Sequence, residues 1–156
     1  MSRGRNYAGS AVLLGSLALI HAAISWPVPA TVAVFGGGAV IVFVAEALVS
    51  KLGLLEHHIG PKVVDVPLYV LFGWTGTIYV ALRLALLLSD GWFVVVLTGV
   101  LATSLDVLSD PRGVGEGFWT YTDDLPGPRY RGVPWWNFLG WFLISTLTAA
   151  LGFWFL

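Results

Sequence analysis

The chain has 156 residues, about the length of one domain. It is 57% hydrophobic and only 11% charged, whereas a typical soluble domain is about 25% charged. Residues 6–45, 66–82, 91–105 and 132–156 carry no Lys, Arg, Asp or Glu. A water-soluble fold cannot cover its surface with so little charge, and a chain this apolar is not intrinsically disordered. The composition therefore predicts an integral membrane protein.

Five apolar segments are long enough to cross a bilayer, which takes about 20 residues per helix. The first uncharged run holds two of them, because Pro27 and Pro29 divide it. The fold class predicted is an all-α integral membrane helical bundle that forms a single membrane domain over residues 1–156, with no internal repeat apparent. We expect its helices at about residues 8–24, 30–50, 67–89, 92–108 and 135–156, and an inner loop at 109–134.

The distribution of basic residues predicts the orientation of the bundle. With the N-terminus in the cytoplasm, the outer turns near Pro27 and Asp90 contain no Lys or Arg, and Arg83 lies within the third helix. The remaining basic residues then all lie inside: Arg3, Arg5, Lys51, Lys62, Arg112, Arg129 and Arg131. Cytoplasmic loops are rich in Lys and Arg. We therefore expect a multi-pass protein of the cell membrane, with its N-terminus inside and its C-terminus outside.

Several kinds of site are excluded by residue counts. The absence of cysteine removes disulfides, thiolate metal sites and iron–sulfur clusters. Three histidines cannot supply the histidine-rich boxes of membrane di-iron enzymes, and eight basic residues are too few for a nucleic-acid surface. We therefore expect no thiolate or histidine-box metal site and no nucleic-acid partner.

Carboxylates gather toward the predicted inner side. Glu46 and Asp106 have similar depth in their spans, and Asp110 lies on the same helix face as Asp106, four residues later. Such a pair repels and usually needs a proton, a cation or an arginine, and a shared proton would create a general acid. The simpler alternatives are a surface pair of Glu46 with Lys51 and a helix-packing hydrogen bond at Asp106.

Other polar residues allow further interpretations. The Asp-x-x-x-Asp spacing also suggests magnesium–diphosphate binding, although the second acidic motif of that class is missing. His57 and His58 are either an interfacial polar pair or site residues, and adjacent positions on a helix would let at most one of them face the acids. His21 is expected to be a packing residue, and Arg83 either reaches toward Asp90 or serves as a counter-ion inside the bundle.

Aromatic residues are dense around the last predicted span. Trp119 and Tyr121 precede it, and Asn137 and Trp141 lie within it. Anchoring at the interface needs only one or two tryptophans. Flat aromatic side chains at this density favour a long, flat apolar ligand, and the alternative is an aromatic belt at the membrane surface.

A set of motifs resembles the carotenoid-biosynthesis membrane hydratase family, of the acyclic carotenoid 1,2-hydratase and bisanhydrobacterioruberin hydratase type. The resemblance covers about residues 45–142 and is closest to the haloarchaeal branch. It rests on Glu46, Asp106-x-x-x-Asp110-Pro111, Gly117-x-Trp119 and Tyr130-x-Gly132-Val133-Pro134-x-x-Asn137-Phe138-x-Gly140-Trp141.

The resemblance implies cofactor-independent addition of water across a terminal C=C of an acyclic C40 or C50 carotenoid. Asp106 is then the leading acid, and Glu46 and Asp110 orient or activate water. The remaining expected site residues contact substrate or water: Trp119, Tyr121, Asn137, Trp141 and His58. The expected partners are the lipid bilayer, the carotenoid, and either a second copy of the chain or another enzyme of the pathway.

Two alternatives remain open from the sequence. One is a non-enzymatic carotenoid-binding or assembly subunit of the membrane. The other is a small proton-coupled transporter that uses Glu46, Asp106 and Arg83 as a relay. No inverted repeat, the hallmark of many transporters, supports the second.

The orientation predicts how single cysteines react in intact cells, and the cysteine-free chain gives a clean background. We expect His58→Cys and Leu125→Cys to be labelled only after the membrane is permeabilised, and Asp90→Cys to be labelled from outside. Protection of position 90 from an impermeant maleimide would invert the topology.

Overall fold

A computed structural model describes residues 2–122 and 124–156. It confirms an all-α bundle, with five helices long and apolar enough to cross a membrane. The second of them is continuous through a π-helical turn. The spans are α1 (Ser2–Ser25); α2 (Val28–Val32), η1 (Ala33–Gly37) and α3 (Gly38–Lys51); α4 (Leu68–Leu88); α5 (Phe93–Gly115); and α6 (Trp135–Phe153).

The largest difference from the predicted boundaries is in α5, which runs to Gly115 instead of ending near residue 108. Pro111 lies inside the helix, and the turn that follows it packs against Trp119. The ring of Trp119 lies directly against Gly113, where a Cβ atom would overlap it. The loop therefore begins at residue 116 rather than 109. The first helix also starts earlier than predicted, at Ser2, and the last ends at Phe153.

The loops at one end of the bundle form short antiparallel ribbons that the sequence did not predict. One ribbon joins distant segments, since β1 (Leu55–His57) pairs with β4 (Trp119–Tyr121) around the pair Glu56 and Thr120. The other two are local hairpins. They pair β2 (Lys62–Val63) with β3 (Val66–Pro67), and β5 (Arg129–Tyr130) with β6 (Val133–Pro134).

The order of the elements reveals an internal repeat, which corrects the expectation of none. The first unit is α3-β1-β2-β3-α4 and the second is α5-β4-β5-β6-α6. Each unit's first helix is followed by a glycine of positive φ, Gly53 at 69° and Gly117 at 70°, the usual left-handed residue after a helix. The hairpin before α4 turns through Val64 and Asp65, and the hairpin before α6 through Arg131 and Gly132, all with positive φ.

Backbone hydrogen bonds and sequence agree with this repeat. The Leu68 amide donates to the Pro61 carbonyl (3.0 Å), and the Trp135 amide donates to the Pro128 carbonyl (3.1 Å). Both second helices begin directly after a Val-Pro pair, and both contain a Gly-Trp pair seven residues after that proline, at Trp74 in α4 and Trp141 in α6. This similarity is hard to see in the sequence for two reasons. The segment 122–128 is longer than its counterpart 58–61, and the two units share backbone turns more than they share side chains.

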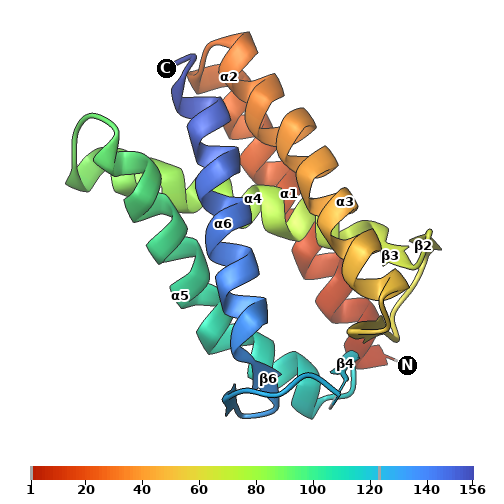
Figure 1. Ribbon diagram of the computed structural model, residues 1–156. Coiled ribbons are helices and arrows are strands. Elements are labelled where there is room, and N and C mark those ends of the chain that lie inside the picture. The colour runs from red at the N-terminus through yellow and green to blue at the C-terminus, as the bar shows by residue number, and fades with distance from the viewer. Residues whose placement is uncertain (1, 123) are drawn as a thin grey trace.

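The two units meet around an approximate two-fold axis. The indole rings of Trp74 and Trp141 stack on each other with centroids 3.4 Å apart and planes 13° apart. The stack joins Trp74 of the first unit to its equivalent in the second, Trp141. The centre of the β1–β4 ribbon likewise joins Glu56 to its equivalent, Thr120. Figure 1 shows α4 passing behind α6, where the two second helices cross. In secondary transporters built from repeats, the binding site lies at the interface between the repeats.

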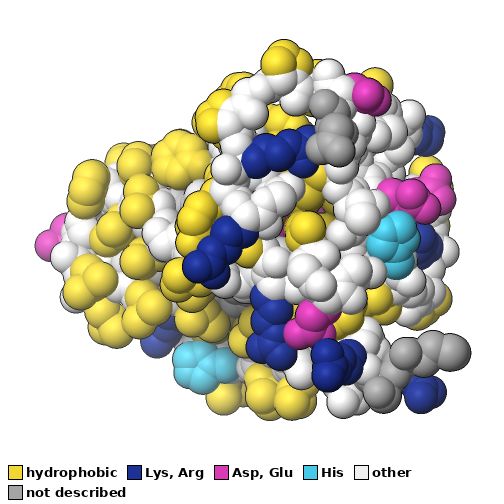
Figure 2. All heavy atoms as spheres, turned by 90° about the horizontal axis from the view of Figure 1, so that it is seen from below, with side chains coloured by type: hydrophobic (Ala, Val, Ile, Leu, Met, Phe, Trp, Pro, Cys, Tyr) yellow, Lys and Arg dark blue, Asp and Glu magenta, His cyan; other side chains and the backbone are white. Residues whose placement is uncertain are grey.

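The N-terminus and the ribbons lie at the same end of the bundle, and the C-terminus lies at the other end (Figure 1). Seen onto the ribbon end, Lys and Arg side chains gather around the loops, and hydrophobic side chains cover the flank (Figure 2). Arg83 belongs to the other end, where its guanidinium lies 5.8 Å from the Trp26 ring. His21 also lies there and contacts the Tyr79 hydroxyl through Nδ1 at 2.5 Å.

Helix α1 stands outside the repeat and packs closely on α4. The crossing depends on Gly15 and Gly76, because a Cβ on Gly76 would lie 2.9 Å from the Gly15 Cα. This contact is backbone against backbone, so no side-chain movement relieves it. Small residues let membrane helices approach in this way.

We expect Gly76→Ala to destabilise the protein by about 1–3 kcal/mol, the usual cost of overpacking. Gly9→Ala on α1 is the matched control, since nothing lies within 4 Å of a Cβ placed there. The control should be neutral or gain up to about 1 kcal/mol from helix propensity. Unfolding in detergent, followed by tryptophan fluorescence, measures both. Equal stability of the two variants would contradict the assigned crossing.

Candidate functional site

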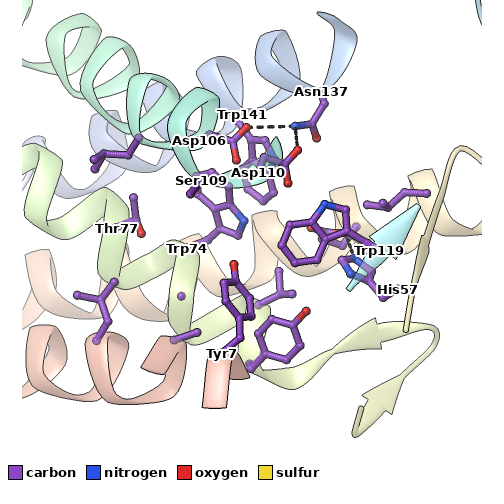
Figure 3. A pocket seen from close by; sticks show the side chains of 18 of the residues that line it. Tyr7, His57, Trp74, Thr77, Asp106, Ser109, Asp110, Trp119, Asn137 and Trp141 are labelled. Atoms are coloured by element: carbon purple, nitrogen blue, oxygen red, sulfur yellow. Dashed lines mark hydrogen bonds and ion pairs between the residues drawn. The ribbon is translucent and has the colours of Figure 1, made fainter. Parts of the chain in front are cut away.

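A pocket of about 300 Å³ lies between the units at the ribbon end. Its walls come from both repeat units and from α1, and its side chains are mainly aromatic and apolar around a few acids (Figure 3). Most of the expected site residues line it together: Glu46, Asp106, Asp110, Trp119, Tyr121, Asn137 and Trp141.

Two carboxylates of α5 share one amide. The Asn137 Nδ2 donates to the Asp106 Oδ2 at 3.1 Å and to the Asp110 Oδ2 at 3.2 Å (Figure 3). All three side chains are buried. Their spacing explains the arrangement, because positions four apart share a helix face and Asn137 lies in the first turn of the neighbouring α6. The amide therefore fixes both acids toward the pocket.

The two acids differ in their partners. Asp110 accepts a second hydrogen bond, from the Tyr121 hydroxyl at 2.7 Å. Burial, and next the negative charge of Asp110, raise the pKa of the Tyr121 phenol well above its usual range. The phenol therefore stays protonated and donates to Asp110. Asp106 accepts only from Asn137 among the hydrogen bonds of the described residues.

A second buried polar pair comes from the first unit. The His57 Nε2 lies 2.9 Å from the Glu46 Oε2, and both side chains are 5% exposed. The Lys62 Nζ donates to the His57 backbone carbonyl, which ties β1 to β2. Glu46 is thus partnered by an imidazole inside the protein, in place of the surface pair with Lys51 considered from the sequence.

The β1–β4 ribbon decides which histidine reaches the pocket. Alternate residues of a strand point to opposite faces. His57 faces inward and lines the pocket, whereas His58 is exposed and lies 3.1 Å from the Thr120 hydroxyl. His58 was expected to contact substrate, but in the structure the pocket is lined by His57 and not by His58. No sequence pattern indicates a strand at this point, so the two neighbouring histidines could not be told apart in advance.

Three aromatic residues of the pocket, in addition to His57, were not foreseen. Trp74 forms one wall with Trp141, and Tyr7 from α1 packs against the Trp119 ring with centroids 5.6 Å apart. Tyr69 contacts Tyr7 edge-on at 5.8 Å, and its buried hydroxyl has no partner among the described residues. The repeated Val-Pro to Gly-Trp pattern could have identified Trp74, whereas Tyr7 comes from a helix outside the motifs.

One side of the pocket is formed by exposed side chains of α1 and α5, namely Ser10, Leu14, Leu105 and Ser109. Toward the ribbon end this side continues into a polar groove. The groove shares Tyr7, Ser10 and Ser109 with the pocket, and is otherwise lined by Arg3, Asn6, Arg112, Gly113, Glu116 and Phe118. The pocket thus lies between an apolar flank and a polar surface.

The acids are not arranged as a metal centre. Within residues 2–122 and 124–156, no three His, Asp or Glu side chains converge as ligands. Asp106 and Asp110 are instead joined by an amide, and Glu46 by an imidazole. This arrangement suits the handling of protons more than the holding of a cation, and the absence of a cofactor stays a prediction.

Comparison with known proteins gives two matches. The model of a family described as "Carotenoid biosynthesis protein" matches residues 7–156. The curated bisanhydrobacterioruberin hydratase of Haloarcula japonica is 39% identical over 57 residues, which cover 35% of this chain and 18% of that relative. The match thus spans less than a fifth of the relative's length. No solved structure matches the chain.

The Tyr121 hydrogen bond predicts a stability effect. Tyr121→Phe removes the donor to Asp110, and a hydrogen bond to a charged group contributes about 1.5–3 kcal/mol. We expect a loss of that size in detergent unfolding at neutral pH. Tyr130→Phe, at an exposed tyrosine of the same loop, should change stability by less than about 0.5 kcal/mol. A neutral Tyr121→Phe would mean that Asp110 does not depend on this phenol.

Proposed function

The chain belongs to the carotenoid biosynthesis protein family, and on that premise we propose that it hydrates a terminal C=C of an acyclic C40 or C50 carotenoid. The product is a tertiary alcohol, and the reaction needs no cofactor. One observation carries the proposal. The buried pair Asp106 and Asp110, joined through Asn137, lies at the polar end of a pocket with aromatic walls. The named hydratase relative supports the same chemistry.

Asp106 is the proton donor in this proposal. Two carboxylates held by one amide repel each other when both are ionised, so they favour sharing a single proton. Asp110 accepts two hydrogen bonds, which stabilise its charged form, whereas Asp106 accepts one. The proton therefore resides on Asp106. A protonated carboxylic acid can transfer it to the terminal alkene carbon.

Protonation breaks the C=C π bond, forms a C–H bond and leaves a tertiary cation. The faces of Trp119, Trp74 and Trp141 can stabilise that cation through their negative ring faces. A water oxygen then donates an electron pair to the cation, forms the C–O bond and gives up one proton to a base of the pocket. Alkene and water are consumed, one tertiary alcohol is formed, and the acid regains its proton from solvent.

The pocket accommodates one end of a carotenoid rather than the whole molecule, because about 300 Å³ is at the lower limit of ordinary ligand sites. The apolar side between Leu14 and Leu105 lets the rest of the chain remain in the bilayer. The polar groove beyond Tyr7 provides a route for water. Both reactants can thus reach Asp106 from different sides.

The environment of the proposed enzyme follows from its spans and charges. We place the ribbon end, with its basic side chains, in the cytoplasm of a cell whose membrane holds the carotenoid. The reaction would then occur near the inner boundary of the bilayer. A second copy of the chain or another enzyme of the pathway remains a proposed partner.

A binding or assembly subunit is the second candidate. The stacked Trp74 and Trp141 and the ring of Trp119 would hold a flat polyene end even without a reaction. A proton relay through Glu46, Asp106 and Arg83 has less support, because Arg83 contacts Trp26 away from the pocket. Pigment that binds to the protein unchanged would favour the subunit.

The central test is expression in a host that accumulates an acyclic carotenoid. We expect the pigment to gain the mass of one water per hydrated end. Asp106→Asn keeps the shape of the side chain but cannot donate the proton, so hydration should fall by about 10²–10⁴-fold while the protein still inserts. Asp124→Asn, at an exposed loop acid, is the control and should leave the rate unchanged. Full activity of Asp106→Asn would remove the acid assignment.

The aromatic wall predicts a smaller effect. Trp119→Leu keeps an apolar side chain but removes the ring face, and a cation–π contact contributes about 0.5–2 kcal/mol. We expect turnover to fall by roughly 2–30-fold, measured at equal amounts of folded protein. Trp135→Leu, at an exposed tryptophan that does not line the pocket, should have no such effect. An unchanged rate with Trp119→Leu would show that this ring does not face the cation.

A further inference from the structure

The internal repeat pairs the polar residues of the pocket. Glu46 in α3 contacts His57 eleven residues later in β1. Asp110 in α5 contacts Tyr121, again eleven residues later, in β4. Each acid lies seven residues before the left-handed glycine that follows its helix, Gly53 or Gly117. The two units therefore present the same dyad, a helix carboxylate with a strand partner, to one pocket.

The partners in the two dyads have different chemistry. The Tyr121 phenol remains protonated and acts as a donor to Asp110. An imidazole can donate from one nitrogen and accept a proton on the other. The His57 Nε2 faces Glu46, and its Nδ1 is buried with no partner among the described residues. Only the first unit's dyad thus contains a partner whose second ring nitrogen can accept a proton.

The proton donor is also confined to one unit. The position of Asp106, one turn before Asp110, corresponds to Val42, one turn before Glu46. The position of Asn137, three residues after a Val-Pro proline, corresponds to Val70. Val42 and Val70 are buried in a single apolar cluster. The second unit therefore supplies the acid, and the first unit has no equivalent of it.

We infer that His57, oriented by Glu46, removes the proton from the water that attacks the substrate cation. The inference rests on the proposed hydration and names its base. As the water oxygen forms the C–O bond, one O–H bond breaks and its proton passes to the His57 Nδ1. The Glu46 carboxylate, 2.9 Å from Nε2, stabilises the imidazolium that results. His57 then releases the proton to solvent, and Asp106 takes one up.

His57 can act as a base only while its imidazole is neutral. Other titratable groups share the pocket and are common to every variant tested. They are Tyr7 from α1, Glu46 from α3, Tyr69 from α4, Asp106 and Asp110 from α5, and Tyr121 from β4, and Lys62 of β2 binds the His57 carbonyl.

The test exchanges one unit's partner for the other's. His57→Tyr keeps a donor for Glu46 and makes the first dyad resemble the second, so a purely structural role would be preserved. His57→Gln removes the base with less change in volume. We expect both variants to bind the acyclic carotenoid at wild-type levels, measured as pigment retained on the purified protein. Their hydration rates should fall by about 10²–10⁴-fold.

His58→Gln is the matched control, since His58 is the next residue and lies on the outer face of the ribbon. It should keep the wild-type rate. If His57→Tyr also keeps that rate, His57 is not the base, although the hydratase proposal stands. If the wild-type protein binds the carotenoid and hydrates none, the proposed function fails and the base assignment fails with it.

Discussion

The need to partner buried carboxylates determines how this bundle is organised at its ribbon end. Charged side chains within a membrane bundle are costly unless they are hydrogen-bonded and face its interior. Here one amide, Asn137, holds both Asp106 and Asp110, and the Tyr121 phenol and the His57 imidazole complete the set. The partners come from α6 and from the two strands of the central ribbon. Helices and ribbon must therefore assemble together for the acids to be stable.

The repeat explains how so short a chain forms such a pocket. Each unit contributes a helix with an acid, a strand with its partner, and a second helix with a tryptophan at the centre. Because the two units are related by an approximate two-fold axis, equivalent groups meet, as Trp74 meets Trp141 and β1 meets β4. Functional asymmetry then needs few changes, since Val42 and Val70 in one unit correspond to Asp106 and Asn137 in the other. A reaction that both delivers and removes a proton suits a pocket whose two halves differ in this way.

Much of the architecture was predictable because it depends on composition and on local pattern. The lack of charge over long runs predicted the membrane bundle, and Pro27 and Pro29 divided the first two spans. The predictions failed where tertiary contacts override local signals. Helix α5 extends beyond residue 108 to Gly115, where Gly113 packs against Trp119, and the central ribbon forms because β1 pairs with β4, far along the chain.

The sequence by itself determined the five apolar spans, the carboxylates near one end and the family motifs, because these are properties of residue type and spacing. Only the tertiary structure decided that His57 rather than His58 faces the pocket, since that depends on the alternation of a strand formed by distant pairing. It also decided that Glu46 pairs with an imidazole and that Trp74 stacks on Trp141. Contacts between residues far apart in the chain depend on how the two units meet, and no local pattern encodes that arrangement.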